Sequence, residues 1–362
     1  MRIAILGGGQ LARMLGLAGY SLGLKFRCLD PAPRSCASDL MEQIEGAWDD
    51  PKALELLLKD ADCVTFETEN VPLKALDLIA ATQVPCYPSY QALRTTQDRL
   101  LEKDFLRASG FETAPYRAPL GREELPSVAA EIGFPAILKT RRMGYDGKGQ
   151  RLVRSEEELF RAWDELGGHD LIVEGFVSFE AEGSLLGVRG ADGQCVFYPV
   201  VKNVHRQGVL FSTELWEHFP GSIEKLQGQM RRLLEGFSYR GVLALEFFLC
   251  GDRVIANEMA PRVHNSGHWT QHAARTSQFE NHLRALCGWS LGEPSALDSF
   301  RMLNLLGEVP DPRLILGVPG AQLSDYSKSA APGRKLGHVT LALGDRGNDF
   351  EERWSRLVGL LR

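Results

Sequence analysis

The chain has 362 residues, of which 44% are hydrophobic, and its 41 lysines and arginines against 47 aspartates and glutamates give a formal net charge of -6. This length exceeds what one hydrophobic core usually fills, so two or three domains are expected. A mildly acidic chain without a block of lysine and arginine lacks the electrostatic footprint of a protein that binds nucleic acid or an anionic membrane.

The cysteines and the apolar runs indicate where the protein works. Seven cysteines are scattered along the chain without a Cys-x-x-Cys pair, which is typical of reduced thiols in the cytoplasm. No apolar run reaches membrane-spanning length, and the sequence opens on a strand-like run instead of a charged and then apolar leader. We therefore expect a soluble, cytoplasmic enzyme.

The first thirty residues have the pattern of a nucleotide-binding α/β unit. A β-rich run over residues 2–6 leads into three glycines, an amphipathic stretch and a second strand. The dinucleotide fingerprint G-x-G-x-x-G/A is matched by Gly7, Gly9 and Ala12, with an acid, Asp30, about 20 residues onward. Because glycines also serve tight strand-to-helix turns, two hypotheses stay open: a dinucleotide site, and a structural turn that lines another pocket.

A third strand, predicted over 62–70, ends in the polar residues Glu67, Glu69 and Asn70. Ligands of α/β sheets bind just past the carboxyl ends of the strands. A pocket is therefore expected here, whatever it holds.

The pattern changes from residue 92 onward. An apolar stripe that includes Leu93, Leu100 and Phe105 predicts one amphipathic helix that stops at Gly110. We place the first domain boundary in this region.

The middle of the chain reads as a second α/β unit. Ser155 with Glu158 three residues later is a capping box that starts a helix. A strand is expected over 171–176, and a hairpin should turn at 190–193. Towards the end, prolines separate short strands before a last helix near 349–361, which indicates a tail subdomain attached to the third unit.

A lysine and a glycine-rich loop give the first chemical signal. The predicted strand that ends at Lys139 is followed by Gly144, Gly147 and Gly149, with Arg141, Arg142 and Lys148 around them. Such a loop offers backbone N–H groups that nucleotide phosphates can approach closely. A P-loop is excluded, because Gln150 and Arg151 stand where lysine and serine or threonine belong. The alternative is a hairpin turn with solvated charges.

Two acids give the second signal. Runs 242–250 and 253–259 flank a Gly251-Asp252 turn and predict a β-hairpin, with Glu246 on its first strand and Glu258 on its second. Strand neighbours lie a few ångströms apart, so the two carboxylates can converge on a cation. Hard oxygen ligands suit magnesium, which takes substrate phosphates in its remaining positions. The alternative, two exposed acids, is disfavoured by their apolar neighbours, and a phosphate lid with a metal site indicates ATP.

Three histidines offer a different metal. His264, His268 and His272 are spaced by four, as zinc ligands on one helix face would be. However, the residues between the first two histidines, Asn265, Ser266 and Gly267, are typical of loops and disfavour a continuous helix. We expect His268 and His272 to be packing or hydrogen-bonding residues.

The order of these features is similar to that of the ATP-grasp enzymes. More narrowly, GGGQLARM, ETENVP, GYDGKGQ, FYPVVKNVH and above all NEMAPRVHNSGHWTQ resemble the 5-(carboxyamino)imidazole ribonucleotide synthase family, from residue 1 to about 345. The resemblance implies an α/β fold, α+β in its C-terminal part, with three domains. These are a Rossmann-like domain over 1–98, a lid domain over 99–184, and a C-terminal domain over 185–362 that includes the tail from about 290.

The resemblance also implies a role for each matching position. For ATP it implies Arg99 and Lys139 on the phosphates, a closing loop of Gly144, Tyr145, Asp146, Gly147, Lys148, Gly149 and Gln150, and an adenine hinge of Glu174, Gly175, Phe176 and Val177. It further implies Glu182 on the ribose, His205 as another nucleotide contact, and Asn257 beside the magnesium ligands Glu246 and Glu258. For the acceptor and bicarbonate it implies Gln10, Glu67, Tyr145, Asp146, Arg262, His264, Asn265 and Ser266, with Lys328, Arg334 and Lys335 on a phosphate. The chain departs from the family at Ala12, Thr68 and Lys202, which affects fine contacts only.

The reaction that the resemblance implies starts with phosphorylation of bicarbonate by ATP to carboxyphosphate. Carboxylation of the exocyclic amine of 5-aminoimidazole ribonucleotide follows, as a step of de novo purine biosynthesis. Asp146 is the expected base, with Tyr145 beside it, and Arg262 and His264 should orient bicarbonate. The resemblance also implies a homodimer.

Three alternatives remain. A related ATP-grasp ligase, such as formate-dependent glycinamide ribonucleotide transformylase, would share the ATP site. The hypothesis of an NAD-dependent oxidoreductase is supported by the glycine turn alone. A nucleotide-binding regulator without catalysis would not need both acids and Lys139.

Overall fold

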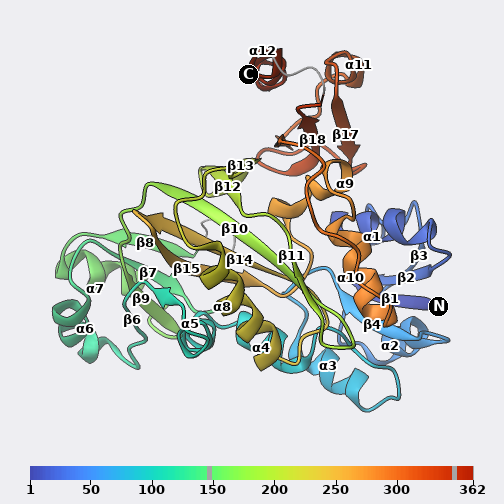
Figure 1. Cartoon of the computed structure of the whole chain (residues 1–362). Helices are drawn as coiled ribbons and strands as arrows, with labels where there is room; N and C mark the ends of the chain where they lie inside the picture. The colour runs from blue at the N-terminus through green and yellow to red at the C-terminus, as the bar shows by residue number, and fades with distance from the viewer. Residues whose placement is uncertain (145–148, 345–348, 362) are drawn as a thin grey trace.

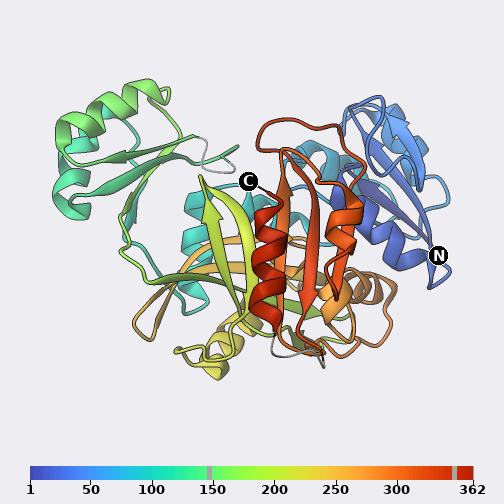
Figure 2. The same ribbon diagram turned by 90° about the horizontal axis from the view of Figure 1, so that it is seen from above.

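The computed structural model describes residues 1–144, 149–344 and 349–361. Its strands form three sheets (Figure 1). A small sheet lies on one side of the molecule and the amino-terminal sheet on the other, with the largest sheet between them (Figures 1 and 2).

The amino-terminal unit is a parallel sheet in the order β3-β2-β1-β4. Its elements are β1 (Arg2–Leu6), α1 (Gln10–Tyr20), β2 (Lys25–Asp30), β3 (Glu42–Glu45), α2 (Pro51–Leu58), β4 (Cys63–Phe66) and α3 (Leu73–Ala80). Alternate residues of β1 face opposite ways: Ala4 packs towards α2 and α3, and Ile5 packs towards α1. Helix α10 of the C-terminal part packs beside α1 on that second face, so both faces are covered, as in other parallel sheets.

The small sheet is antiparallel in its pairings, in the order β6-β9-β7-β8, with α6 and α7 packed against it. The elements of this region are α4 (Tyr90–Thr96), α5 (Arg99–Ala108), β5 (Glu112–Thr113), β6 (Tyr116–Arg117), η1 (Arg122–Glu124), α6 (Leu125–Ile132), β7 (Ala136–Thr140), β8 (Gln150–Val153), α7 (Glu156–Glu165) and β9 (Leu171–Gly175). The capping box is confirmed in part, because the Ser155 hydroxyl accepts the Glu158 N–H at 3.2 Å. The Glu158 carboxylate accepts from Arg154 rather than from Ser155.

The largest sheet runs β17-β18-β16-β13-β12-β10-β14-β15-β5, with β11 paired to β10. Its elements are β10 (Ala181–Arg189), β11 (Cys195–Phe197), β12 (Val201–Arg206), β13 (Val209–Leu215), α8 (Ile223–Gly236), β14 (Gly241–Cys250), β15 (Arg253–Ala260), η2 (Asn265–Gly267), α9 (Thr270–Ala273), α10 (Gln278–Cys287), β16 (Phe300–Leu306), α11 (Pro312–Leu316), β17 (Ala321–Asp325), β18 (Lys335–Ala342) and α12 (Phe350–Gly359). The tail thus extends this sheet through β16, β18 and β17. The predicted hairpins at 190–193 and 251–252 and the last helix are confirmed.

Two predicted elements differ from the structure. The single helix expected from residue 92 is two helices, because Asp98 breaks the run and caps α5 by accepting the Leu100 N–H at 3.0 Å. The strand predicted over 62–70 ends at Phe66, since the Glu67 side chain turns back to the start of α1.

We propose that the lid domain ends in the link 176–180 rather than at residue 184, because β10 lies in the largest sheet over its whole length. The boundary at residue 98 falls between α4 and α5 and is kept as a proposal. Within the described ranges, no helix is both long and apolar enough to cross a bilayer.

Candidate active site

Two carboxylates face each other across the β14–β15 hairpin. Glu246 pairs directly with Glu258, and the register slips immediately afterwards, so that Phe247 pairs with Ala256 and Asn257 is left over as a β-bulge. Bulges next to active sites commonly re-aim side chains. The prediction that Glu246 and Glu258 lie on paired strands of one hairpin is therefore confirmed.

The electrostatics of this acid pair favour a bound cation. Burial, followed by the neighbouring Glu258, raises the pKa of Glu246 to about 7. The His264 Nε2 atom is 3.3 Å from Glu246, and an Arg99 nitrogen is 3.4 Å from Glu258. Burial and the Arg262 guanidinium lower the pKa of His264 to about 3, so His264 is neutral and does not balance the acids.

A buried ion cluster lies next to the acid pair, where the small sheet meets α5. The amines of Lys139, at the end of β7, and of Lys103, on α5, lie 3.0 Å and 3.2 Å from the same Glu174 oxygen. Burial alone would raise the pKa of Glu174, but the two lysines lower it to about 2. The other Glu174 oxygen, Oε1, is buried and has no hydrogen-bond partner in the described chain. An acceptor without a partner suits an N–H donor of a ligand.

Arg99 joins this cluster to the glycine-rich loop. Its guanidinium donates to the Gly144 carbonyl at 3.3 Å as well as contacting Glu258. Gly149 has φ +71, and a Cβ there would lie 2.7 Å from the Thr140 hydroxyl, so the loop returns to Gln150 on β8 only through glycine. The predicted loop residues Tyr145, Asp146, Gly147 and Lys148 lie outside the described residues.

The predicted hinge residues lie at the end of β9 in the small sheet, and the predicted ribose residues lie on two neighbouring strands of the largest sheet. The N–H groups of Gly175 and Phe176 donate to Pro115 and Pro135 at 2.8 and 3.1 Å, and Phe176 is exposed, followed by the partly exposed Val177. Glu182 on β10 and His205 on β12 make a hydrogen bond of 2.8 Å. Burial would lower the pKa of His205, but Glu182 and Glu246 raise it overall.

The segment after β15 connects the acid pair to the amino-terminal sheet. Arg262 pairs with both oxygens of Glu69, whose pKa is lowered to about 2 because this guanidinium outweighs the effect of burial. The Ser266 hydroxyl lies 2.9 Å from His264 Nδ1. Both amide atoms of Asn265 are buried without a partner among the residues described, so they too can serve a polar ligand.

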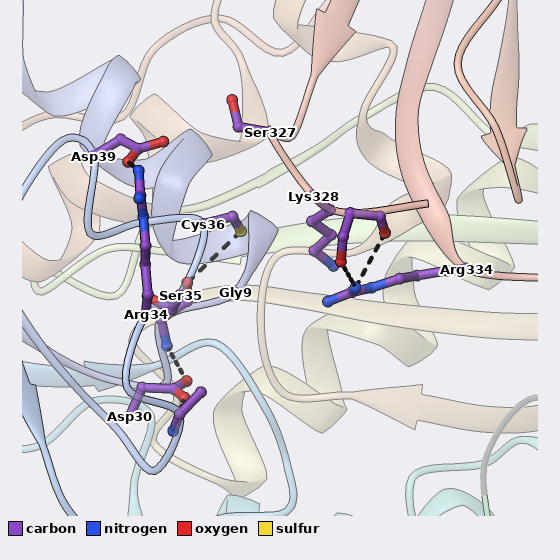
Figure 3. Close-up of a pocket in the computed structure, with 12 residues that line it drawn as sticks. Gly9, Asp30, Arg34, Ser35, Cys36, Asp39, Ser327, Lys328 and Arg334 are labelled. Atoms are coloured by element: carbon purple, nitrogen blue, oxygen red, sulfur yellow. Dashed lines mark hydrogen bonds and ion pairs between the residues drawn. The ribbon is translucent and has the colours of Figure 1, made fainter. Parts of the chain in front are cut away.

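A cavity of about 340 Å³ lies between the amino-terminal sheet and the loop before β18 (Figure 3). Its lining residues are Gly8, Gly9, Asp30, Ala32, Arg34, Ser35, Cys36, Asp39, Ser327, Lys328, Ser329 and Arg334. Two predicted phosphate clamps, Lys328 and Arg334, are in this set, and the Lys328 amine contacts Gln10. Lys335 does not line the cavity; it is close enough to Glu246 to lower the pKa of that acid.

The glycine turn after β1 holds a side chain of the protein itself. Glu67 accepts from the N–H groups of Gly9, Leu11 and Ala12 at 2.9, 3.1 and 3.4 Å. It therefore occupies the helix N-terminus where a dinucleotide's pyrophosphate would bind. Asp30 is also engaged, accepting from Gly8 at 2.7 Å. The structure favours the hypothesis of a structural turn that lines another pocket.

Among the residues described, no group of three or more histidine, cysteine or acidic side chains is placed so that it could hold a metal ion, and the zinc alternative therefore gains no support. His268 Nδ1 lies 3.2 Å from Gln278 Nε2, and His272 Nε2 lies 3.1 Å from the Ser324 hydroxyl. Both histidines are hydrogen-bonding residues, as predicted.

Sequence reasoning missed four groups at the site. Asp98, Glu102 and Lys103 are buried polar residues of α5 or its cap, and Arg34 lines the cavity. Adjacent charged residues in an amphipathic helix look like a solvated face. In the sequence, the only sign that these charged residues are buried is that they lie close to the apolar stripe of the helix.

Comparisons with known families and proteins fit this geometry. Residues 1–97 match the ribonucleotide synthetase preATP-grasp domain, 104–279 the ATP-grasp domain, and 301–353 the phosphoribosylaminoimidazole carboxylase C-terminal domain. The N5-carboxyaminoimidazole ribonucleotide synthase of Pseudomonas aeruginosa is 44% identical over 347 residues, which cover 96% of each chain.

The chain belongs to the N5-carboxyaminoimidazole ribonucleotide synthase family.

Solved structures of this family are closely similar. The N5-carboxyaminoimidazole ribonucleotide synthetase of Thermus thermophilus superposes with a TM-score of 0.94 at 46% identity, covering 100% of this chain and 98% of that one. The Aspergillus clavatus N5-carboxyaminoimidazole synthase, in complex with ADP and 5-aminoimidazole ribonucleotide, superposes with a TM-score of 0.87 at 30% identity, covering 99% and 97%. The chain therefore has the ATP-grasp fold of an ATP-dependent ligase, with a preATP-grasp parallel sheet.

Proposed function

We propose how the described residues carry out the reaction of their family. The protein makes N5-carboxyaminoimidazole ribonucleotide from 5-aminoimidazole ribonucleotide, ATP and bicarbonate, a step of purine biosynthesis. The observation that carries the assignment of roles is the direct pairing of Glu246 with Glu258 across a bulged hairpin.

The acid pair fits magnesium. Both ligands are hard carboxylate oxygens, and two protein ligands leave positions for phosphate oxygens. Burial and the neighbouring Glu258 raise the pKa of Glu246, and a cation bound between the two acids would offset the repulsion between them. When bound there, magnesium would draw charge from the phosphates during transfer. Asn257 is the bulged residue beside this pair.

The nucleotide is proposed to lie between the small sheet and the hairpin. Lys139 and Arg99 supply positive charge for its phosphates, which is the largest contribution to catalysis expected in phosphoryl transfer. Glu174 Oε1, buried without a partner in the described chain, would accept an N–H of adenine, beside the hinge residues Gly175, Phe176 and Val177. Glu182, fixed by His205, would accept from the ribose hydroxyls.

The ribonucleotide is proposed to occupy the cavity of Figure 3. Its phosphate would meet Lys328 and Arg334, with Lys335 nearby, and Gln10 and Glu67 lie on the side of the amino-terminal sheet. The amine would then point towards Arg262, His264, Asn265 and Ser266.

In the reaction, a bicarbonate oxygen attacks the terminal phosphorus of ATP, ADP leaves, and carboxyphosphate results. Arg262, held by Glu69, orients the bicarbonate anion, and the neutral His264 can hold a proton at Nε2 towards it. The ribonucleotide amine then attacks the carboxyl carbon, inorganic phosphate leaves, and Asp146 takes the amine proton. The loop that carries Tyr145 and Asp146 would exclude water from the intermediate.

A phosphate-release assay that omits each substrate in turn tests this function. We expect ADP formation to require both bicarbonate and 5-aminoimidazole ribonucleotide. ADP formation that continues without the ribonucleotide, or that formate and glycinamide ribonucleotide support instead, would contradict it. NAD should not shift the melting temperature, whereas ADP with magnesium should raise it.

A cytoplasmic location and a homodimer are further proposals. All seven cysteines are free, which suits a reducing compartment. Sedimentation in solution would test the dimer against a single chain of 40.1 kDa.

A further inference from the structure

On its outer edge, away from β14, β15 has no strand partner among the described residues at Glu258, its member of the acid pair. Strand β5 pairs with β15 at Ile255 and Ala256 only. The bulge then leaves Asn257 without an opposite residue on β14. Backbone groups that a bulge or an edge leaves open need other partners when they are buried.

Helix α5 supplies these partners through two consecutive side chains. The Lys103 amine donates to the Asn257 carbonyl at 2.9 Å, and the Glu102 carboxylate accepts the Met259 N–H. Each side chain reaches one of the two residues that flank Glu258. Glu102 and Lys103 are only 2% exposed, and α5 packs directly on β15.

Two buried ionisable groups are a costly way to cover a strand edge. One more strand would make the same backbone hydrogen bonds without burying ionisable groups, whose desolvation is expensive. Lys103 also contacts Glu174 at 3.2 Å, so the same helix ties β9 of the small sheet to β15. This cost is explained if the geometry of the β15 edge matters for more than folding.

We propose that Glu102 and Lys103 are positioning residues: they complete the outer edge of β15 in place of a strand and thereby hold the bulge that sets Glu258 opposite Glu246. Neither residue touches a substrate in this scheme. The inference rests on the proposed function, because it assigns both residues to the alignment of the proposed magnesium ligands.

Calorimetric titration of ADP, with and without magnesium chloride, tests the proposal on the full chain. In the wild type, magnesium should increase ADP affinity at least tenfold. Glu102→Leu replaces the acceptor for the Met259 N–H with a side chain of similar size, and should abolish most of this gain. ADP affinity without magnesium should stay within about twofold. Glu102→Gln keeps an acceptor oxygen and should retain the gain. If only the negative charge of Glu102 mattered, Glu102→Gln would lose the gain.

Arg27→Met is the matched control for loss of stability. Arg27 is a buried cation of the amino-terminal sheet that donates to the carbonyls of Leu56 and Lys59 at 2.9 Å each. Its replacement should lower the melting temperature, as Glu102→Leu does, but leave the magnesium gain unchanged.

Three outcomes separate the hypotheses. A wild type without any magnesium gain would contradict the proposed metal site itself. A wild-type gain that Glu102→Leu retains, despite a lower melting temperature, would overturn the positioning role. If Glu102→Leu does not fold, Lys103→Met takes its place and should lose the magnesium gain together with part of the magnesium-free affinity, since Lys103 also contacts Glu174; failure of both variants to fold would assign the two side chains to the fold and overturn the proposal.

Discussion

At the scale of single residues, the acid pair carries the chemistry that we propose. Glu246 and Glu258 face each other at a register slip, and the neighbouring cations Arg99 and Lys139 are already engaged with Glu258 and Glu174. A cation bound by both acids would therefore add positive charge to that of Arg99 and of Lys335, which already acts on Glu246.

Glu258→Gln should reduce the rate of ADP formation about a hundredfold, because it removes one preorganised charge contact at the transferring phosphate. The melting temperature should change little. Steady-state kinetics at saturating magnesium measures this, with Glu55→Gln, an exposed acid of α2, as the control. Turnover within about twofold of the wild type would argue against a role for Glu258 in phosphoryl transfer.

Glu102 should make stability depend on pH. Burial and the charge of Glu258 raise its pKa to about 8, from 4.5, although Arg99 and Lys103 also face it and act in the opposite direction. The folded state then binds more protons than the unfolded state between about pH 4.5 and 8, so the free energy of unfolding falls as pH rises through that window, by up to about 1.4 kcal/mol per pH unit. Urea unfolding at several pH values should show a flatter profile for Glu102→Gln; parallel profiles would refute the assignment.

At the scale of elements, α5 is the helix on which the site depends. Its N-cap, Asp98, is 1% exposed, accepts the Leu100 N–H and pairs with Arg141 and Arg142 at 2.7 and 3.2 Å. The same residue therefore starts the helix and fixes the chain that enters the glycine-rich loop.

Asp98→Ala should lower the free energy of unfolding by more than the loss of a helix cap alone. Loss of an N-cap costs about 1 kcal/mol, and breaking a buried ion pair adds to it, up to a total of about 3 kcal/mol because Arg141 can regain water. Asp50→Ala, which removes the cap of α2 on the exposed Lys52 N–H, is the control and should cost about 1 kcal/mol. Equal losses in urea unfolding would show that the arginine pairs contribute nothing.

Elements were predictable from sequence where the local pattern is strong. The β14–β15 hairpin has two β-rich runs around a Gly-Asp turn, and the placement of Glu246 and Glu258 on paired strands followed from it. The break at Asp98 was not predicted, because the apolar stripe continues across it and only the partners Arg141 and Arg142, from a distant segment, favour the cap. The bulge and the role of Glu102 likewise depend on tertiary contacts that leave no local signal.

At the scale of the whole molecule, the proposed acceptor site needs both ends of the chain. The cavity is lined by residues between 8 and 39 and by residues between 327 and 334, and the Arg262–Glu69 pair joins the amino-terminal sheet to the hairpin. The glycine fingerprint left two hypotheses open for the same reason, because the acid that fills the turn, Glu67, follows a different strand.

Arg334→Ala should weaken binding of 5-aminoimidazole ribonucleotide about tenfold, the value of one hydrogen bond to a charged group. ADP affinity should not change, because the cavity and the nucleotide residues belong to different segments. Calorimetry with each ligand measures both effects, and Arg313→Ala, an arginine of α11 whose side chain is 90% exposed, is the control. A parallel loss of ADP affinity would mean that the two sites are not separate.

The central claim is that Glu246 and Glu258 hold a divalent cation on the phosphates of the nucleotide. The most direct measurement is a crystal structure with ADP and manganese in place of magnesium, with the ion located by its anomalous scattering. We predict a peak bonded to both carboxylates and to a phosphate oxygen. A peak that contacts neither acid, or bound ADP without a peak between them, would contradict the account.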